Sequence, residues 1–252
     1  MWRLRLIIDD GDPYYQMALD EAMLLLRSAG VIPDTLRLYV FNPSAATIGY
    51  FQSLSRSINK EFILENKIPV TRRITGGGSV YHDARGEITY AVIAGLERVP
   101  RDILESYRFI TMGVIYAARS LGANADYVPL NDGVIDGKKF SGQAQTRKRN
   151  TLLQHGTFMY NTDLDMLAKI LRAPKKKLRD KGVSSIRERV TTVSEVVGRR
   201  ISREEAVEAL IHGFSKALDA ELVPGKLTSI ELELAKTLRW KYMSWKWIEL
   251  RP

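Results

Sequence analysis

The order of strand-like and helix-like segments restricts the possible folds of this chain more than any other feature. Apolar alternation and short apolar runs predict strands at 2–8, 35–41, 45–51, 70–73, 87–94, 138–145 and 152–160. These strands occur in clusters with hairpin connections, and no regular strand–helix–strand rhythm links them. We therefore expect an α+β protein with a mixed β-sheet flanked by helices, rather than a doubly wound parallel sheet.

Helix signals lie at the start of the chain, in its middle and along its last third. Asp12-Pro13 predicts a helix that runs to about Gly30, and Asp102 with Glu105 predicts a capping box for a helix that ends at Gly122. No repeat or low-complexity linker divides the chain, so we expect one domain over residues 1–252 with a helical C-terminal part from about 163 to 252. Helical spacing predicts further helices at about 59–67, 163–171, 203–218 and 229–240.

Composition excludes several classes of protein. The 252 residues contain no cysteine, which excludes disulfides, thiolate metal sites and every mechanism with a cysteinyl intermediate. No run approaches the roughly 20 apolar residues that span a bilayer, and the N-terminus lacks the apolar core of a signal peptide. We expect a cytoplasmic protein without a membrane partner.

The net charge of +9 is concentrated in the second half of the chain. Residues 1–137 contain 14 basic and 16 acidic side chains, whereas residues 138–252 contain 24 and 13. A basic half suggests an anionic partner such as a nucleotide, a nucleic acid or an acidic protein. The run Lys175–Lys181 has no interleaved aromatic residues for base stacking, so we interpret it as a basic surface and expect no nucleic acid.

A triple glycine between two predicted strands is the strongest chemical signal. Gly76, Gly77 and Gly78 remove every Cβ from the loop, so backbone N–H groups can approach a ligand closely. Arg72 and Arg73, just upstream, supply positive charge for phosphate or carboxylate oxygens. The segment is neither a Walker A loop nor a Rossmann fingerprint. We interpret it as an anion-binding loop, although a plain flexible turn would also account for three glycines.

A second chemical signal is a pair of lysines that follows a predicted hairpin turn. Tight turns are predicted at Asp132-Gly133 and Asp136-Gly137. Lys138 and Lys139 then point to opposite faces of one strand, so one can enter a site while the other meets solvent. A lysine ammonium suits a phosphate or a polarised carbonyl, and an Asp beside a phosphate suits Mg²⁺. Exposed lysines after a turn are also common, so this signal alone is weak.

The histidines and serines do not form a recognisable catalytic motif. His82, His155 and His212 lack metal-ligand spacing, which disfavours a zinc site. The Gly-x-Ser-x-Gly elbow of a serine hydrolase is also missing from the sequence.

Taken together and in this order, the motifs resemble the lipoate–protein ligase A family of the biotin/lipoate protein ligase superfamily. The resemblance implies a class II synthetase-like fold shared with biotin ligases, in the catalytic-domain-only form that lacks a C-terminal accessory domain. The similar segments are Ile48–Gln52, Arg72–Asp83, Asn131-Asp132, Lys139–Gly142, His155–Thr157 and Leu178–Thr192.

The resemblance also implies roles for individual residues. Lys139 would be catalytic and would contact both the lipoyl carboxyl and the α-phosphate of ATP. Asp132 would lie near the metal and hold Mg²⁺. The remaining residues implied to bind ATP and lipoyl-AMP are Arg73, Gly76, Gly77, Gly78, Ser79, Val80, Tyr81, His82, Asn131, Gly142 and His155.

The implied activity is that of an ATP-dependent, AMP-forming lipoate–protein ligase. Lipoate would attack the α-phosphorus of ATP, and a lysine of an acceptor protein would then attack the lipoyl-AMP carbonyl. The implied acceptors are acidic lipoyl domains of 2-oxoacid dehydrogenases and the glycine cleavage H protein. A separate small accessory subunit is expected to support the activation step.

Several alternatives remain open at this point. Octanoyl transferases share the scaffold but pass the acyl group through a cysteine, which this chain lacks. A lipoyltransferase that uses preformed lipoyl-AMP needs no thiol and is the second interpretation. A biotin ligase would have a different arginine–glycine loop, and a non-catalytic lipoate or nucleotide carrier would not need Lys139.

Overall fold

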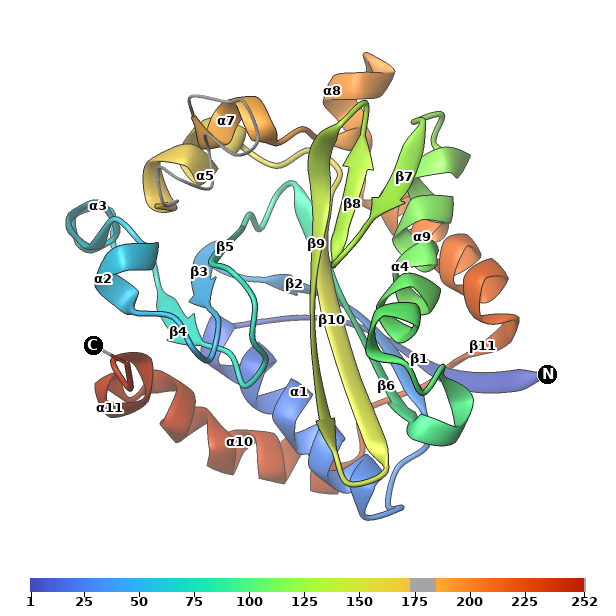
Figure 1. Ribbon diagram of the computed structural model, residues 1–252. Helices are drawn as coiled ribbons and strands as arrows, with labels where there is room; N and C mark the ends of the chain where they lie inside the picture. Colours follow the sequence, from blue (N-terminus) through green and yellow to red (C-terminus); the bar gives the residue numbers. More distant parts are fainter. Residues whose placement is uncertain (173–184, 252) are drawn as a thin grey trace.

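A mixed β-sheet runs through the computed structural model, which describes residues 1–172 and 185–251 (Figure 1). Within these residues the large sheet has eight strands in the order β11-β1-β2-β6-β10-β9-β8-β7. Strand β1 pairs in parallel with β2 and β11, and the other neighbours pair antiparallel. The mixed sheet predicted from the sequence is therefore confirmed. The strands are β1 (Trp2–Gly11), β2 (Thr35–Phe41), β6 (Glu87–Gly95), β7 (Ala125–Val128), β8 (Asp132–Ile135), β9 (Lys138–Lys148), β10 (Thr151–Met159) and β11 (Ala220–Pro224).

Both faces of this sheet are covered by helices because its central strands bury side chains on both sides. In β2, Leu36 and Leu38 contribute to one hydrophobic core, whereas Tyr39 and Phe41 contribute to another. This alternation follows from the two-residue period of a strand. The first core lies under helices α4 and α9, and the second lies under α1 and α10 (Figure 1). The bounds are α1 (Pro13–Ser28), α4 (Ile103–Ser120), α9 (Arg203–Leu218) and α10 (Ser229–Met243).

A small three-stranded sheet carries the glycine loop. Its order is β4-β3-β5, and the loop connects β4 to β5. A third core, which includes Ile48, Val70 and Tyr81, anchors this sheet among short helices. In Figure 1 the small sheet lies beside β9 and β10 of the large one. These elements are β3 (Ala45–Ile48), β4 (Val70–Arg72), β5 (Val80–His82), α2 (Leu54–Ser57), α3 (Lys60–Glu65), α5 (Leu164–Ile170), α7 (Ile186–Arg189) and α11 (Trp245–Ile248).

Helix ends follow the sequence signals closely, with one exception. Asp12 caps α1 by accepting from the N–H groups of Tyr14 and Tyr15. Asp102 caps α4 by accepting from the N–H of Glu105 at 2.9 Å. No bond from the Glu105 side chain back to Asp102 is found for this helix, so the predicted reciprocal capping box is only half formed.

Two sequence-based expectations about the fold are wrong. The strand predicted at 45–51 ends at Ile48, because Gly49–Gln52 turns beneath the glycine loop. Asp132-Gly133 is not a turn but the start of β8. The C-terminal part also contains a strand that was not predicted, since Ala220–Pro224 forms β11 at the edge of the large sheet. This strand is short and half exposed, so it carries little apolar periodicity.

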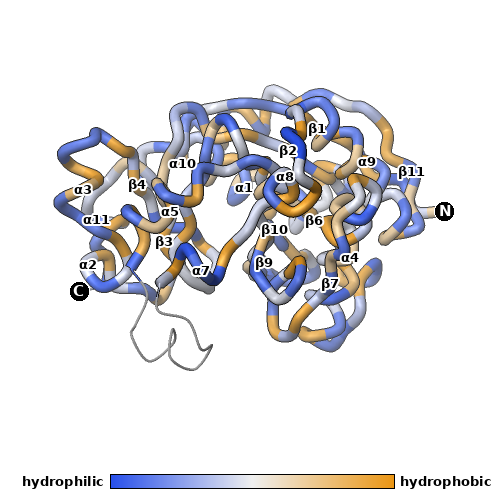
Figure 2. The backbone as a smooth tube through the Cα atoms, turned by 90° about the horizontal axis from the view of Figure 1, so that it is seen from above, coloured by the Kyte–Doolittle hydropathy of each residue, from blue (hydrophilic) through white to orange (hydrophobic). Residues whose placement is uncertain are grey.

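Hydrophilic and hydrophobic residues are interspersed along the chain when the molecule is seen from above (Figure 2). In the part of the chain that the structure describes, no helix has both the length and the apolar character needed to cross a bilayer. The basic run Lys175–Lys181 lies outside the described residues.

Candidate active site

Two adjoining cavities lie where the small sheet meets β9 and β10. The inner cavity is narrow, about 70 Å³, and its wall includes Met17, Tyr39 and Ala144. The outer groove is larger, about 370 Å³, and its wall includes Leu130 and Arg189. The two cavities adjoin each other, since they share the wall residues Gly78, Ser79, Val80, Asn131, Lys139, Gly142 and Thr157.

The structure brings nearly all of the predicted site residues to these two cavities. Arg73, Gly77, His82 and His155 line only the inner cavity. Tyr81 and Asp132 line only the outer groove. Gly76 lines neither of them, because it lies beside the ring of Phe51.

A third hollow lies elsewhere in the described part of the chain. It has a volume of about 650 Å³, and its wall includes Asp163, Arg187 and Glu195. Arg187 is already paired with Glu195 at 2.7 Å and with Asp165 at 3.4 Å. Its wall contains three acidic and three arginine side chains, and of the segments similar to the family only Leu178–Thr192 reaches it. We therefore place the active site at the pair of cavities where the other segments meet.

The glycine loop is held in a conformation that needs glycine at two positions. Gly77 has a φ of +87°, a backbone conformation that residues with a side chain rarely adopt. A Cβ on Gly49 would come within 2.2 Å of the carbonyl oxygen of Gly77, so the Gly49 backbone supports the loop from below. The adjacent Tyr50 donates its N–H to the carbonyl of Thr75 at 2.8 Å. Gly78, by contrast, has open space where a Cβ would stand.

Arg73 lies beneath this loop and holds it. Its guanidinium donates to the carbonyl oxygens of Gly76 and Gly78, at 2.9 and 2.8 Å. It also donates to the hydroxyls of Thr47 at 2.8 Å and Thr75 at 3.3 Å. Burial lowers the pKa of Arg73 to about 10, so the side chain remains a cation at neutral pH.

Lys139 and Lys138 diverge as the strand alternation predicts. Lys138 is exposed, whereas Lys139 lines both cavities and its side chain lies over Gly142. The Lys139 ammonium is 2.6 Å from Asp132 Oδ1, and Arg189 approaches Asp132 Oδ2 at 3.6 Å. Asp132 therefore stands between two cations.

This arrangement does not fit the Mg²⁺ site that the resemblance implied at Asp132. A divalent cation prefers several oxygen ligands, but both carboxylate oxygens of Asp132 face positive side chains. The described residues also contain no group of three His, Asp or Glu side chains that could hold a metal. We derive no step through a metal here.

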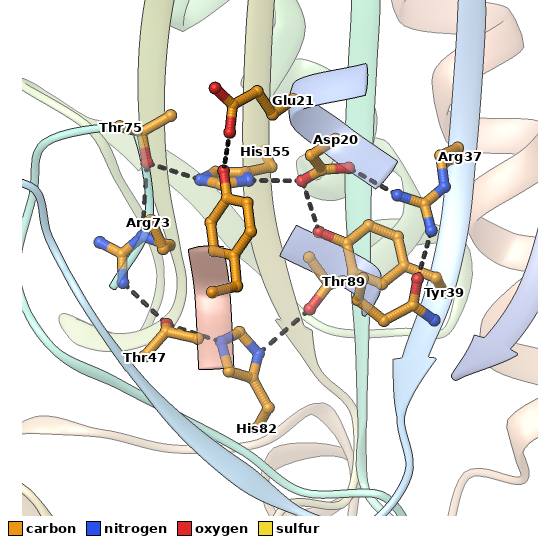
Figure 3. A network of polar contacts seen from close by, with 12 residues as sticks. Asp20, Glu21, Arg37, Tyr39, Thr47, Arg73, Thr75, His82, Thr89 and His155 are labelled. Carbon is orange, nitrogen blue, oxygen red and sulfur yellow. Dashed lines mark hydrogen bonds and ion pairs between the residues drawn. The ribbon is translucent and has the colours of Figure 1, made fainter. Parts of the chain in front are cut away.

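The two histidines of the site are buried, and each contacts a buried acidic side chain. His155 Nδ1 lies 2.8 Å from Asp20 Oδ2, as Figure 3 shows, and His82 Nδ1 lies 3.1 Å from Glu87 Oε2. Burial lowers the pKa of His155, and it lowers the pKa of His82 to well below its usual value. Both side chains are therefore neutral at neutral pH.

Sequence reasoning missed two residues of the cavity wall and two acidic residues that lie behind it. Asp20 sits in the middle of a helix, and Glu87 at the start of a strand, where nothing in the local sequence marks them as partners of histidines. Arg189 lies within Leu178–Thr192, a segment that the resemblance covers, but no role was assigned to it. Gln143 follows Gly142 directly and lines the inner cavity, so proximity to the motif was its only signal.

Comparison with known proteins identifies the family. The Lipoyl protein ligase A/B catalytic domain matches residues 12–215. The chain belongs to that family. It is similar to the octanoyltransferase LipM of Brevibacillus brevis, with 34% identity over 98% of both chains, and to LipM of Bacillus subtilis, with 32% identity over 98% of this chain and 97% of that protein.

Solved structures of the same family confirm the fold. A bi-partite lipoate protein ligase from Thermoplasma acidophilum, studied together with its E2 lipoyl domain, has a TM-score of 0.85 and 33% identity, and the match covers 100% of this chain and 99% of that one. A lipoate-protein ligase A bound with ATP has a TM-score of 0.84 and 30% identity, with 99% of each chain covered. The lipoate–protein ligase resemblance and its implied fold are thus confirmed.

The activity that the resemblance implied for this chain is not confirmed. ATP-dependent lipoate ligation, and with it the lipoyl-AMP alternative, is contradicted because the curated relatives that match along the whole chain are octanoyltransferases. The lack of cysteine excludes an acyl-cysteine intermediate, but it does not exclude octanoyl transfer. It was therefore wrong to set octanoyl transferases aside on that ground. What stands is that the chain is an enzyme of the lipoate ligase and transferase family.

The neutral histidines make stability depend on pH. The unfolded chain takes up protons on His82 and His155 near a pKa of about 6.5, whereas the folded chain resists their protonation. Stability is therefore full above this value and is lost as the pH falls. We expect the free energy of unfolding, measured by urea denaturation, to fall between about pH 7.5 and about pH 5.5.

His82→Gln is expected to reduce this slope, and His212→Gln is the matched control because His212 is exposed. Equal slopes in the wild type and in His82→Gln would show that His82 is protonated as readily in the folded chain as in the unfolded one.

Proposed function

We propose that this protein transfers an octanoyl group from a thioester donor directly to a lysine of a lipoyl domain. The observation that carries the proposal is the similarity to octanoyltransferases over 98% of the chain. A thioester is an acyl donor that is already activated, so this transfer needs neither ATP nor Mg²⁺. Among the described residues that line the two cavities, Asp132 is the one carboxylate, and its two oxygens face Lys139 and Arg189, which is consistent with such a reaction.

The transfer is a single displacement at the acyl carbonyl. The neutral amine of the acceptor lysine forms a bond to the carbonyl carbon, and the carbon–sulfur bond breaks. The nitrogen gives up one proton, the leaving thiolate takes up a proton, and the products are an amide and a free thiol. Negative charge grows on the carbonyl oxygen during the attack, and cations or N–H donors nearby lower the barrier by stabilising it.

Three side chains at the cavities are suited to stabilise this charge. Lys139 lies in the wall shared by the inner cavity and the outer groove, and Arg73 is a buried cation in the wall of the inner cavity. Gln143 Nε2 is buried and has no hydrogen-bond partner in the part of the chain that the structure describes. An unpaired amide donor is costly. Gln143 lines the inner cavity, and a rotation of its side chain would turn this closed-off N–H toward an acyl oxygen there.

The absence of cysteine sets the order of events. An acyl-cysteine would let the donor leave before the acceptor arrives. Without one, the thioester and the acceptor lysine occupy the site together. The outer groove, of about 370 Å³, is the space through which both reach the inner cavity.

The proposed acceptor is a lipoyl domain with an acidic surface. One structural relative and the charge of the outer groove support this choice. The Thermoplasma protein that resembles this chain was studied with an E2 lipoyl domain. Arg189 and Lys139 give the outer groove a basic rim, which suits an acidic acceptor surface. A separate accessory subunit stays a prediction, and it loses its chemical reason here because a thioester brings its own activation.

Removing the Lys139 ammonium is expected to reduce transfer strongly. With octanoyl-coenzyme A and a recombinant lipoyl domain as substrates, Lys139→Ala should lower kcat/KM by about 100-fold or more, the usual effect of losing a group that stabilises an oxyanion. Lys138→Ala, the matched control on the exposed face of the same strand, should change it less than about threefold. Mass spectrometry of the lipoyl domain measures the octanoyl-lysine formed.

Comparable losses in the two variants would contradict the assignment of Lys139. The same assay tests the donor. Octanoyl-lysine that forms only from the free acid with ATP, and not from the thioester, would refute the proposed function. An octanoyl group attached to the enzyme itself would refute direct transfer.

Gln143→Leu separates a role in the reaction from a role in folding. Replacing an unpaired buried amide with an apolar side chain removes a desolvation cost, so the melting temperature should stay the same or rise. Transfer should nevertheless fall about tenfold or more, because one donor to the acyl oxygen is lost. A variant that keeps full kcat would show that the Gln143 amide does not contact the acyl oxygen.

A further inference from the structure

A chain of hydrogen bonds links Asp20, deep in α1, to the glycine loop. Asp20 contacts His155, His155 contacts Thr75, and Thr75 contacts Arg73 (Figure 3). Arg73 in turn donates to the carbonyl oxygens of the loop. The chain joins α1, β10 and the loop after β4, which are far apart in the sequence.

Asp20 can only accept hydrogen bonds, and three donors surround it. Arg37 donates to Oδ1 at 2.6 Å, and the Tyr39 hydroxyl donates to Oδ2 at 2.8 Å. Burial opposes ionisation of Asp20, but the hydrogen bond from His155 and the charge of Arg37 outweigh it and lower the pKa. The carboxylate is therefore ionised at neutral pH, and the third contact must also come from a donor.

That third contact fixes where His155 carries its proton. A neutral imidazole has one N–H and one nitrogen lone pair. Facing an ionised carboxylate at 2.8 Å, Nδ1 carries the proton, which leaves Nε2 as an acceptor. The Thr75 hydroxyl, 2.7 Å from Nε2, then donates to it. Its oxygen remains free to accept from Arg73 Nε at 3.3 Å.

A second chain of the same kind reaches Arg73 from the other side. It runs from Glu87 to His82, then to Thr47, whose hydroxyl accepts from Arg73 at 2.8 Å. Burial raises the pKa of Glu87 well above its usual value, so this carboxyl is held neutral. A neutral carboxyl both donates and accepts. Glu87 therefore does not dictate the tautomer of His82, and it offers a matched comparison with Asp20.

We propose that Asp20 is a positioning residue of the active site, which sets the His155 tautomer and, through Thr75 and Arg73, the shape of the glycine loop. It does not line either cavity, so its effect on the reaction is indirect. The effect on transfer rests on the proposed function, whereas the effect on the tautomer does not.

Asp20→Asn tests this proposal with almost no change in size. The new asparagine offers one oxygen and one NH₂ to Arg37, Tyr39 and His155. Where its NH₂ faces His155 Nδ1, the imidazole proton of His155 has to move to Nε2. Nε2 would then donate to Thr75, and the bond from Thr75 would be lost. ¹⁵N NMR of the full chain should show His155 protonated at Nδ1 in the wild type and at Nε2 in Asp20→Asn.

Octanoyl transfer is measured on the same samples at matched melting temperature. Asp20→Asn should lower kcat/KM about tenfold or more, and Glu87→Gln, which also replaces a buried carboxyl with an amide, should lower it less than about threefold. A wild type with the His155 proton at Nε2 would overturn the proposal whether or not Asp20→Asn folds. So would equal losses in the two variants.

The readouts keep the two proposals apart. A wild type that transfers no octanoyl group would refute the proposed function, while its NMR spectrum would still decide the tautomer that Asp20 sets. Normal transfer by an Asp20→Asn variant with a changed tautomer would refute the positioning role alone.

Discussion

A buried guanidinium that makes no ion pair within the described residues is the constraint on which this site depends. Arg73 is almost fully enclosed, and its direct partners are two hydroxyls and two carbonyl oxygens. Burying a charge without a direct counterion is expensive. Here the ionised carboxylate of Asp20 lies one histidine and one threonine away. The cation is thus held in place without being neutralised, and its field remains available to a ligand in the inner cavity.

The same arrangement explains why the resemblance gave the fold correctly and the reaction incorrectly. A glycine loop over an arginine, with a lysine opposite, stabilises negative charge on an acyl carbonyl oxygen. That requirement is the same whether the leaving group is AMP or a thiolate. The motifs therefore indicate acyl transfer to an amine, and the identity of the donor depends on parts of the outer groove that no motif marks. Even within a motif, the side chain of Asp132 lies between Lys139 and Arg189, a contact that the sequence alone does not predict.

Much of the fold could be predicted because its signals are local. Caps at Asp12 and Asp102 and the two-residue alternation of the central strands depend on neighbours in the sequence. The glycine loop and the pair Lys138-Lys139 were found for the same reason, whereas the choice of Lys139 came from the resemblance. Asp20, Glu87 and the unpaired Gln143 amide were not found, because each acquires its role from a strand or helix distant in the sequence. Strand β11 was missed because pairing with β1, rather than its own composition, makes it a strand.

The lack of cysteine, taken with this geometry, places a demand on the acceptor that a cysteine enzyme would avoid. In a single displacement the lysine amine has to reach the carbonyl carbon while the thioester is still bound. Near-attack geometry then requires the reacting atoms to be held about 3–3.5 Å apart by the protein alone. Arg73 holds the glycine loop by two hydrogen bonds, and the Gly49 backbone packs against it. If transfer is direct, as we propose, a loop held in this way supplies the fixed orientation of the acyl group that a covalent acyl-enzyme would otherwise provide.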